Sequence, residues 1–170
     1  MNDHSHISET FTLAMSEFLA GNYQKCIEYL NEVIQHDPGH EKALLTRGAA
    51  HLKLDDASAA IENFNRVIDS DSGSARAYHL RGLSREQLGQ SDEALRDFHR
   101  AIEIDPDYGA AYYSRAALYS RSGETDRAAD DIAMVTALTN RNIESFANEN
   151  NVWRSQHLRL ESILESELNR

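Results

Sequence analysis

The sequence predicts an all-α protein built as a solenoid of helical pairs, and three observations support this prediction. The composition favours helices, because 21 alanines stand against four valines and only two prolines in 170 residues. A set of small and apolar residues recurs every 34 residues. Within each recurrence the apolar residues follow the i, i+3, i+4, i+7 spacing of one helical face. A hydrophobic share of 41% is enough to form a buried core.

Four successive segments carry the recurrence, and each is expected to fold as one helix–turn–helix unit: 7–40, 41–74, 75–108 and 109–142. One pair of helices cannot bury its own apolar face, so neighbouring units must stack. Residues 1–6 precede the first unit and are expected to be flexible. In chain order, the helices are expected near 8–20, 24–36, 41–53, 57–69, 75–88, 92–103, 109–121 and 125–138.

Small residues mark the places where the two helices of a unit approach closely. In the first helices they are Ala14, Gly48, Gly82 and Ala116, and at the start of the second helices Cys26, Ala60, Ala94 and Ala128. A bulkier residue at such a position would overpack the unit at a cost of about 1–3 kcal/mol. A large apolar residue follows four positions later, at Leu30, Phe64, Phe98 and Ile132. The turn carries Gly21, Gly89 and Gly123, suited to a left-handed C-cap, and Asp55 departs from this pattern.

One recurring phase is polar. Arg47, Arg81 and Arg115 share it, and Asn63, Asp97 and Asp131 stand sixteen residues later in each case. Hydrogen bonds between these side chains would satisfy guanidinium groups that packing removes from water. We therefore expect a structural ladder rather than a ligand site.

With these positions in place, the units resemble the tetratricopeptide repeat (TPR), whose period is 34 residues. The resemblance covers residues 7–142 and implies a right-handed α-solenoid whose first helices line a concave groove that binds ligands. Carried over by repeat phase, the resemblance assigns the groove to Phe11, Met15, Leu45, Ala49, Arg76, His79, Leu83, Tyr113 and Arg121. The same phases carry Lys42, Lys53, Glu86 and Gln87.

Two observations concern what this groove could bind. Burial of Phe11, Met15 and Phe18 under the N-terminal tail or against a second chain is an equal alternative to ligand binding. The family's carboxylate clamp, which grips chaperone C-termini with lysine, asparagine and arginine, is not expected. Among the matching positions, only Arg76 has suitable chemistry.

Residues 143–170 do not continue as a fifth unit, because no glycine ends a first helix there. Their apolar residues share one helical face: Ile143, Phe146, Trp153, Leu160, Leu164 and Leu168. We expect an amphipathic helix that caps the end of the fourth unit. The alternative is a dimerisation helix. The run 148–151, Asn-Glu-Asn-Asn, is a weak helix former and could kink or split it.

No constellation of residues indicates catalysis, a metal or a cofactor. The glycines stand singly, so neither a dinucleotide-binding turn nor a phosphate loop is present. Cys26 occupies a small-residue position, where a buried structural thiol is expected rather than a nucleophile. His36 and His40 straddle Pro38, which breaks the helical spacing that two metal ligands would need.

The charge of -11 bears on partners and location. Phosphate backbones and anionic lipids would repel such a chain unless it had a concentrated basic patch, so neither nucleic-acid binding nor membrane insertion is expected. The N-terminus lacks a basic region followed by an apolar run, and we expect a cytoplasmic protein. We predict a non-enzymatic module that binds a peptide or helix of a partner protein. The alternatives are a secretion-type chaperone for a client protein and a self-assembling scaffold, with homo-oligomers possible.

Overall fold

The computed structural model describes residues 3–141, and every regular element within this range is a helix. Seven helices have defined bounds: α1 (Asp3–Leu19), α2 (Tyr23–His36), α3 (Glu41–Lys53), α4 (Ala57–Ser70), α5 (Ala75–Gln87), α6 (Ser91–Ile104) and α7 (Gly109–Ser122). A further helix covers residues 125–141. The all-α prediction is confirmed.

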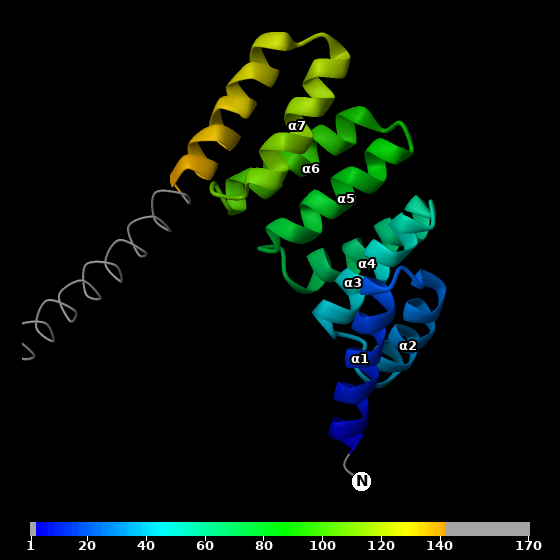
Figure 1. The fold of residues 1–170 in the computed structure, drawn as a ribbon. Helices are drawn as coiled ribbons and strands as arrows, with labels where there is room; N and C mark the ends of the chain where they lie inside the picture. Colours follow the sequence, from blue (N-terminus) through cyan, green and yellow to red (C-terminus); the bar gives the residue numbers. More distant parts are fainter. Residues whose placement is uncertain (1–2, 142–170) are drawn as a thin grey trace, which may run out of the picture.

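The helices form four antiparallel pairs that stack along an arc, from α1 at one end to the helix of residues 125–141 at the other (Figure 1). Each helix packs on the helices before and after it in the chain. The first helices of the pairs also contact one another, α1 with α3, α3 with α5 and α5 with α7. This arrangement is the predicted solenoid, and it brings the first helices onto one face.

The N-terminal helix is longer than the sequence predicts. α1 begins at Asp3, so it includes residues 3–6 of the segment 1–6. The predicted flexibility of that segment stays a prediction. Side-chain contacts support this extra turn. The hydroxyl of Ser5 donates to Glu9 at 3.1 Å, and His6 Nε2 lies 2.7 Å from a carboxylate oxygen of Glu32 in α2.

The last described helix is also longer than expected. α2, α4 and α6 end at equivalent positions of their units, His36, Ser70 and Ile104. The equivalent position of the fourth unit is Leu138. Here the helix runs on through residue 141, because residues 139–141 include no proline or glycine that would end it. Arg141 Nη2 lies 2.7 Å from Asp107 Oδ1, in the turn before α7.

The core lies between the two helices of each unit and between neighbouring units. Phe64 and Phe98 are completely buried, each against the glycine predicted at the crossing of its unit. Ile132, at the same phase of the fourth unit, is 45% exposed. Nothing within residues 3–141 follows this unit to cover it. The Asp55 that departs from the turn glycines has a φ of 61°, in the left-handed region that these glycines also adopt.

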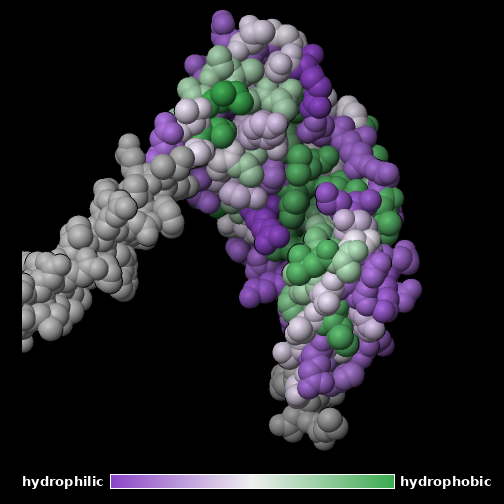
Figure 2. Space-filling view, viewed as in Figure 1, coloured by the Kyte–Doolittle hydropathy of each residue, from purple (hydrophilic) through white to green (hydrophobic). Residues whose placement is uncertain are grey.

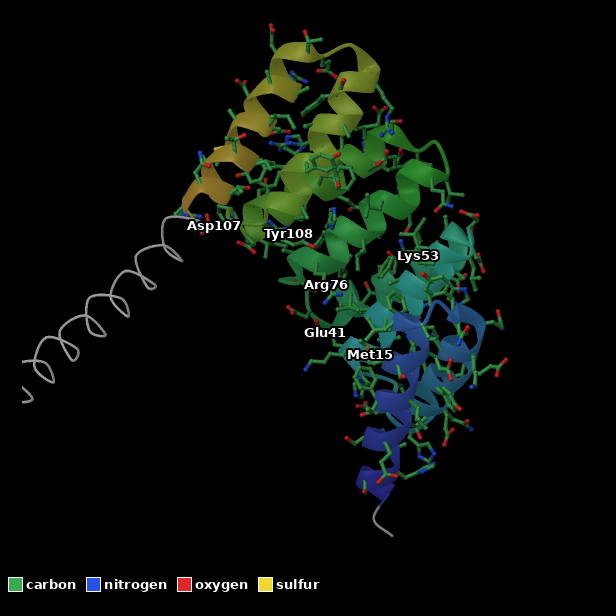
Figure 3. The ribbon with its side chains drawn as sticks, viewed as in Figure 1. Met15, Glu41, Lys53, Arg76, Asp107 and Tyr108 are labelled. Carbon is green, nitrogen blue, oxygen red and sulfur yellow. The ribbon has the colours of Figure 1, made fainter. Side chains whose placement is uncertain are left out.

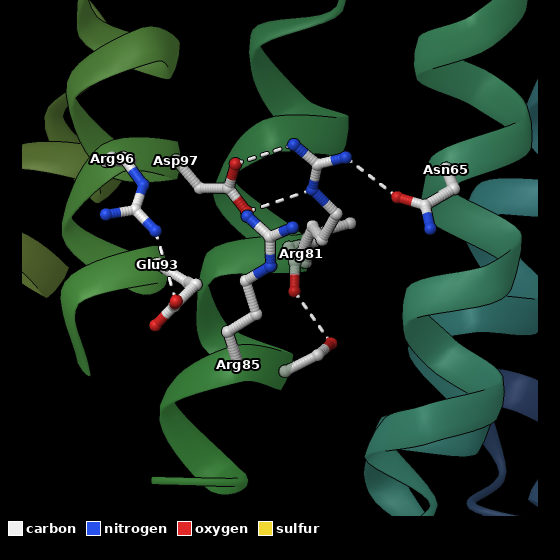
Figure 4. A network of polar contacts seen from close by, with 8 residues as sticks. Asn65, Arg81, Arg85, Glu93, Arg96 and Asp97 are labelled. Atoms are coloured by element: carbon white, nitrogen blue, oxygen red, sulfur yellow. Dashed lines mark hydrogen bonds and ion pairs between the residues drawn. The ribbon is translucent and has the colours of Figure 1, made fainter. Parts of the chain in front are cut away.

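The polar ladder is present within the second, third and fourth units, and in the second and third units its arginine also reaches the unit before (Figure 4). Arg81 donates from Nε and Nη2 to the carboxylate of Asp97 at 2.9 and 2.7 Å, and from Nη1 to Asn65 Oδ1 of α4 at 2.7 Å. Arg85 donates to the same Asp97 carboxylate at 2.7 Å. Asp97 itself is buried, so four hydrogen bonds hold α4, α5 and α6 in register. The predicted hydrogen bonds between Arg81 and Asp97 are confirmed, and their contribution to stability stays a prediction.

The second and fourth units contain the equivalent pairs, in which the arginine faces a neutral amide in one case and a carboxylate in the other. Arg47 Nε donates to Asn63 Oδ1 at 2.8 Å and its Nη1 to Asn31 Oδ1 at 2.7 Å. Arg115 donates to both carboxylate oxygens of Asp131 at 2.8 and 2.7 Å. These hydrogen bonds raise the pKa of Arg115, whereas burial lowers the pKa of Arg47, which faces a neutral amide. Both arginines stay charged at neutral pH.

Candidate partner-binding groove

The candidate site is the face formed by α1, α3, α5 and α7. Figure 2 shows apolar residues gathered along this face over α1, α3 and α5, with hydrophilic residues on either side. The residues labelled in Figure 3 follow the same side of the molecule, from Met15 in α1 to Asp107 and Tyr108 in the turn before α7. The 34-residue period produces this face, because equal phases of successive first helices come to lie next to one another.

At the N-terminal half of the face, the predicted residues are partly taken up by packing. Phe11 is half-buried, with its ring centroid 5.1 Å from that of His40. Met15 is half-buried as well, and its sulfur accepts a hydrogen bond from the hydroxyl of Thr46 at 3.6 Å. Ala49 is half-buried, whereas Leu45 is buried in the core. Phe11, Met15 and Ala49 therefore offer apolar surface, whereas Leu45 belongs to the core of the solenoid.

At the C-terminal half, Leu83 and Arg121 line a cavity of about 510 Å³ between α5 and α7. The rest of its lining comes from Glu86, Gln87, Ser91 and Leu118. The guanidinium of Arg121 pairs with the carboxylate of Glu86, and Gln87 Nε2 donates to Asp55 Oδ1 at 2.7 Å. The first contact links α7 to α5, and the second links α5 to the turn after α3, at the edge of the groove.

Three residues of this region were not among the predicted groove positions. Leu118 is largely buried and forms part of the cavity lining, although its phase is filled by the small residues Ala50 and Ser84 in other units. Ser91 opens a second helix, and Asp55 lies in a turn. A repeat-phase argument for the first helices misses such residues, because they belong to other phases or to other elements.

His79 occupies a predicted groove position, but its side chain is only 7% exposed. Its Nε2 lies within hydrogen-bond distance of Ser114 Oγ at 2.9 Å, and the hydroxyl of Tyr108 lies 3.2 Å from its Nδ1. Burial lowers the pKa of His79 to about 4, so the ring is neutral at physiological pH. His79 therefore joins α5 to α7 and has little surface to offer a ligand.

Basic side chains lie along the edges of the groove. Arg76, Lys42 and Lys53 are exposed, and none of them forms an ion pair within the part of the chain that the structure describes. Arg76 lies near Tyr108 (Figure 3), and its charge opposes the rise that burial causes in the pKa of this tyrosine. The chain as a whole is acidic, so these cations supply local positive charge along the groove.

Tyr113, another predicted groove residue, is 62% exposed. It does not line the cavity of Leu83 and Arg121. Instead it contributes to a second hollow, of about 340 Å³, which it forms with Ile132 at the end of the solenoid. Tyr113 thus stands where the groove meets the end face of the fourth unit.

Two further properties concern residues 3–141. The structure brings together no group of three or more histidine, cysteine or carboxylate side chains that could hold a metal ion in this range. None of the helices described is both long enough and apolar enough to cross a membrane.

Comparison with protein families identifies the class. Three family models, each described as a tetratricopeptide repeat, match residues 17–83, 75–108 and 98–129. The chain belongs to the tetratricopeptide repeat family, as its 34-residue period and stacked helical pairs require. A comparison with curated proteins finds no significant match.

Solved structures share the fold at low sequence identity. A crystal structure of MamA is 24% identical, with a TM-score of 0.75, and the match covers 84% of this chain and 83% of MamA. TTC0263, a thermophilic TPR protein of Thermus thermophilus, is 20% identical with a TM-score of 0.71, over 78% of this chain and 74% of its own. The first TPR of Spaghetti (RPAP3), bound to the HSP90 peptide SRMEEVD, is 21% identical with a TM-score of 0.67, over 71% and 96%.

Proposed function

We propose that this protein is a binding module without a catalytic role, which holds a peptide or helix of a partner protein along the face of its first helices. The observation that carries the proposal is the cavity between α5 and α7, which lies on this face and is lined by Leu83, Leu118 and the ion pair of Arg121 with Glu86. The bound relative RPAP3 supports it by analogy of fold, since that domain holds an HSP90 peptide.

The apolar part of the groove would anchor the partner. Leu83 and Leu118 offer the cavity two apolar walls, and Phe11 and Met15 extend apolar surface toward α1. Losing one buried anchor at such an interface typically costs about 2 kcal/mol or more of binding free energy. An extended segment or an amphipathic helix with apolar side chains at intervals suits this geometry.

The charged part of the groove would select the partner's chemistry. Arg76, Lys42 and Lys53 attract carboxylates, while the acidic remainder of the chain repels acidic segments elsewhere. We therefore propose a partner segment that combines apolar anchors with acidic residues. Because the basic side chains are exposed, their attraction should weaken as ionic strength rises.

Partner capture with matched variants tests the proposal. The immobilised chain is incubated with lysate of its source cells, and the retained proteins are compared for wild type, Leu83→Ser and Arg76→Glu. Leu83→Ser should weaken capture at every salt concentration, and Arg76→Glu should weaken it most at low salt. Circular dichroism of each variant should show unchanged helicity.

The control is Arg100→Glu, which makes the same charge change on α6, a second helix outside the groove. The Arg100 pair with Glu103 is an exposed contact between residues three apart, which contributes little to stability. Capture should survive this change. If Arg100→Glu abolishes capture while both groove variants bind normally, the partner does not use the first-helix face.

A further inference from the structure

The polar pair of the fourth unit borders a cavity that is separate from the groove. This cavity has a volume of about 360 Å³ and is formed by α6, α7 and the helix of residues 125–141. It is lined by His99, Arg115, Tyr119, Arg127, Asp130 and Asp131. None of these residues is a predicted groove position, and every one of them carries a polar group. We call this space the ladder cavity.

One nitrogen of the Arg115 guanidinium distinguishes the fourth unit from the two units before it. In those units Nη1 of the ladder arginine donates to an asparagine Oδ1 at 2.7 Å, in Asn31 and in Asn65. Arg115 uses Nε and Nη2 for Asp131, and its Nη1 forms no hydrogen bond within residues 3–141. Every fully buried side-chain nitrogen or oxygen in this range has a partner, so Nη1 is accessible from the cavity.

His99 stands in α6 at the position that Asn31 and Asn65 occupy in α2 and α4. Its Nδ1 lies 3.0 Å from the carbonyl oxygen of Leu95. Because a carbonyl oxygen can only accept, Nδ1 carries the proton, and Nε2 of the neutral ring is an acceptor. The ladder cavity is therefore lined by a donor nitrogen of Arg115 and an acceptor nitrogen of His99.

Tyr119 gives the ladder cavity an aromatic wall. The equivalent residue of the third unit is Arg85, which donates to the carboxylate of Asp97 at 2.7 Å (Figure 4). Tyr119 is buried, and the guanidinium carbons of Arg115 and Arg127 lie 6.0 and 5.5 Å from the centroid of its ring. The ring thus holds both arginines in place at the cavity and offers a ligand apolar contact.

The charges around the ladder cavity favour an uncharged ligand. Two arginines and two aspartates line it, so their charges cancel. Arg115 is paired with Asp131, and Arg127 is paired with Glu124. An ion entering the cavity would lose hydration without a net attraction to replace it.

We propose that the ladder cavity binds a small molecule that carries a primary carboxamide. The carbonyl oxygen of the ligand accepts from Arg115 Nη1, as the amide oxygen of Asn65 accepts from Arg81. The NH₂ group of the ligand donates to His99 Nε2. A carboxylate offers no proton to Nε2, and an ammonium group offers no acceptor to Nη1. A cavity of about 360 Å³ lies at the lower end of the range for small-molecule sites, which suits a ligand of amino-acid size.

An NMR titration of the isotope-labelled full chain tests the proposal. Propionamide is compared with two molecules of nearly the same shape, propionate, which offers only acceptors, and butanone, which lacks the NH₂ group. Propionamide should cause saturable shifts of the Arg115 Nε–H signal and of the backbone amides of Tyr119 and Asp130. It should bind about fivefold more tightly than either analogue, because each analogue loses one hydrogen bond.

His99→Asn is the informative variant, because it gives α6 the amide that α2 and α4 carry. The amide oxygen of this variant should accept from Arg115 Nη1, so propionamide binding should fall by about fivefold or more. His99 is exposed, and urea unfolding should show that the variant is at least as stable as wild type. The matched control is His36→Asn, an exposed position at the end of α2, which should bind propionamide like wild type.

Three results would overturn the proposal: equal binding of propionate or butanone, no saturable shift with propionamide, and wild-type binding by His99→Asn. The source of the carboxamide is tested with L-glutamine and with the tripeptide Ala-Gln-Ala. Tighter binding of L-glutamine supports a small molecule. Equal or tighter binding of the tripeptide would overturn that assignment in favour of a glutamine side chain of another protein. None of these outcomes depends on whether the groove binds a partner.

Discussion

The ring of Phe98 occupies the space that a side chain on Gly82 would need. A Cβ added to Gly82 would lie 2.5 Å from Phe98 Cε1, and one added to Gly48 would lie 2.6 Å from Cε1 of Phe64. The other two units combine alanine with a smaller partner, Ala14 with Leu30 and Ala116 with Ile132. The size of the residue in the first helix is therefore matched to the size of the residue that crosses it.

We expect Gly82→Ala to destabilise the protein even though alanine is the better helix former. The gain in helix propensity is about 1 kcal/mol, whereas overpacking a well-filled crossing costs about 1–3 kcal/mol. The ring of Phe98 is completely buried, and a Cβ on Gly82 would lie 2.5 Å from its Cε1. Urea unfolding followed by circular dichroism should show a net loss of up to about 2 kcal/mol.

The double variant Gly82→Ala/Phe98→Leu recreates the Ala14–Leu30 combination of the first unit. Phe98→Leu alone should destabilise by leaving a cavity. Together the two changes should cost less than the sum of the single losses, because the alanine methyl fills part of the space that the ring vacates. Losses that simply add would show that the two residues are not matched in size.

A second prediction concerns the ladder. Asp97→Ala should destabilise by about 3 kcal/mol, because it leaves the guanidinium groups of Arg81 and Arg85 partly buried without their carboxylate. Asp131→Ala deprives one guanidinium, that of Arg115, of its carboxylate rather than two, and should cost less. Thermal and urea unfolding measure both losses.

The matched variant for the ladder is Asp97→Asn, which installs the residue that the second unit carries as Asn63. An amide oxygen can still accept from Arg81, as Asn63 accepts from Arg47, so the loss should be smaller than with alanine. If Asp97→Ala and Asp97→Asn both unfold like wild type, the ladder contributes nothing to stability.

Residue types at repeated phases allowed much of this structure to be predicted. The stacked units, the Gly82 crossing and the Arg81–Asp97 contact follow from the 34-residue period, because each unit packs on a copy of itself. The ends could not be predicted in this way. α1 begins at Asp3, and the last helix runs past Leu138, because no neighbouring unit within residues 3–141 fixes where they stop.

The groove was predicted less completely than the fold. The repeat phase of a residue indicates which face of its helix it lies on, but not how deeply its side chain is buried. His79 and Leu83 both occupy groove positions of α5, yet only Leu83 lines the cavity. The difference comes from neighbours on other elements, since Tyr108 and Ser114 enclose His79. Phase information for α5 alone cannot reveal these neighbours.

A third prediction uses the thiol of Cys26. Its side chain is completely buried, and burial raises its pKa, so the reactive thiolate is scarce in the folded state. A thiol reagent at neutral pH should label folded protein far more slowly than urea-unfolded protein. Cys26→Ala should fold normally, since Ala60, Ala94 and Ala128 fill the same phase. Rapid labelling of the folded chain would contradict the buried position.

The last prediction concerns pH and His79. Its pKa in the folded protein is about 4, whereas an unfolded histidine titrates near 6.5. As the pH falls below 6.5, the unfolded chain binds a proton at this position and the folded chain does not. Stability linked to His79 is therefore fully present above pH 6.5 and is lost progressively down to pH 4. A shift of this size corresponds to about 3 kcal/mol.

The measurement compares wild type with His79→Gln by urea unfolding between pH 7 and pH 4. Carboxylate titration also destabilises the fold in acid, but it affects both proteins and cancels in the difference. His79→Gln should be the less stable protein at pH 7, because it loses the fitted ring between Tyr108 and Ser114. As the pH falls to 4, the gap should narrow by about 3 kcal/mol, because only wild type loses the histidine contribution. The same substitution at the exposed His36 is the matched control. A gap that stays constant from pH 7 to pH 4 would mean that His79 binds protons equally in the folded and unfolded states, and that it is not enclosed between α5 and α7.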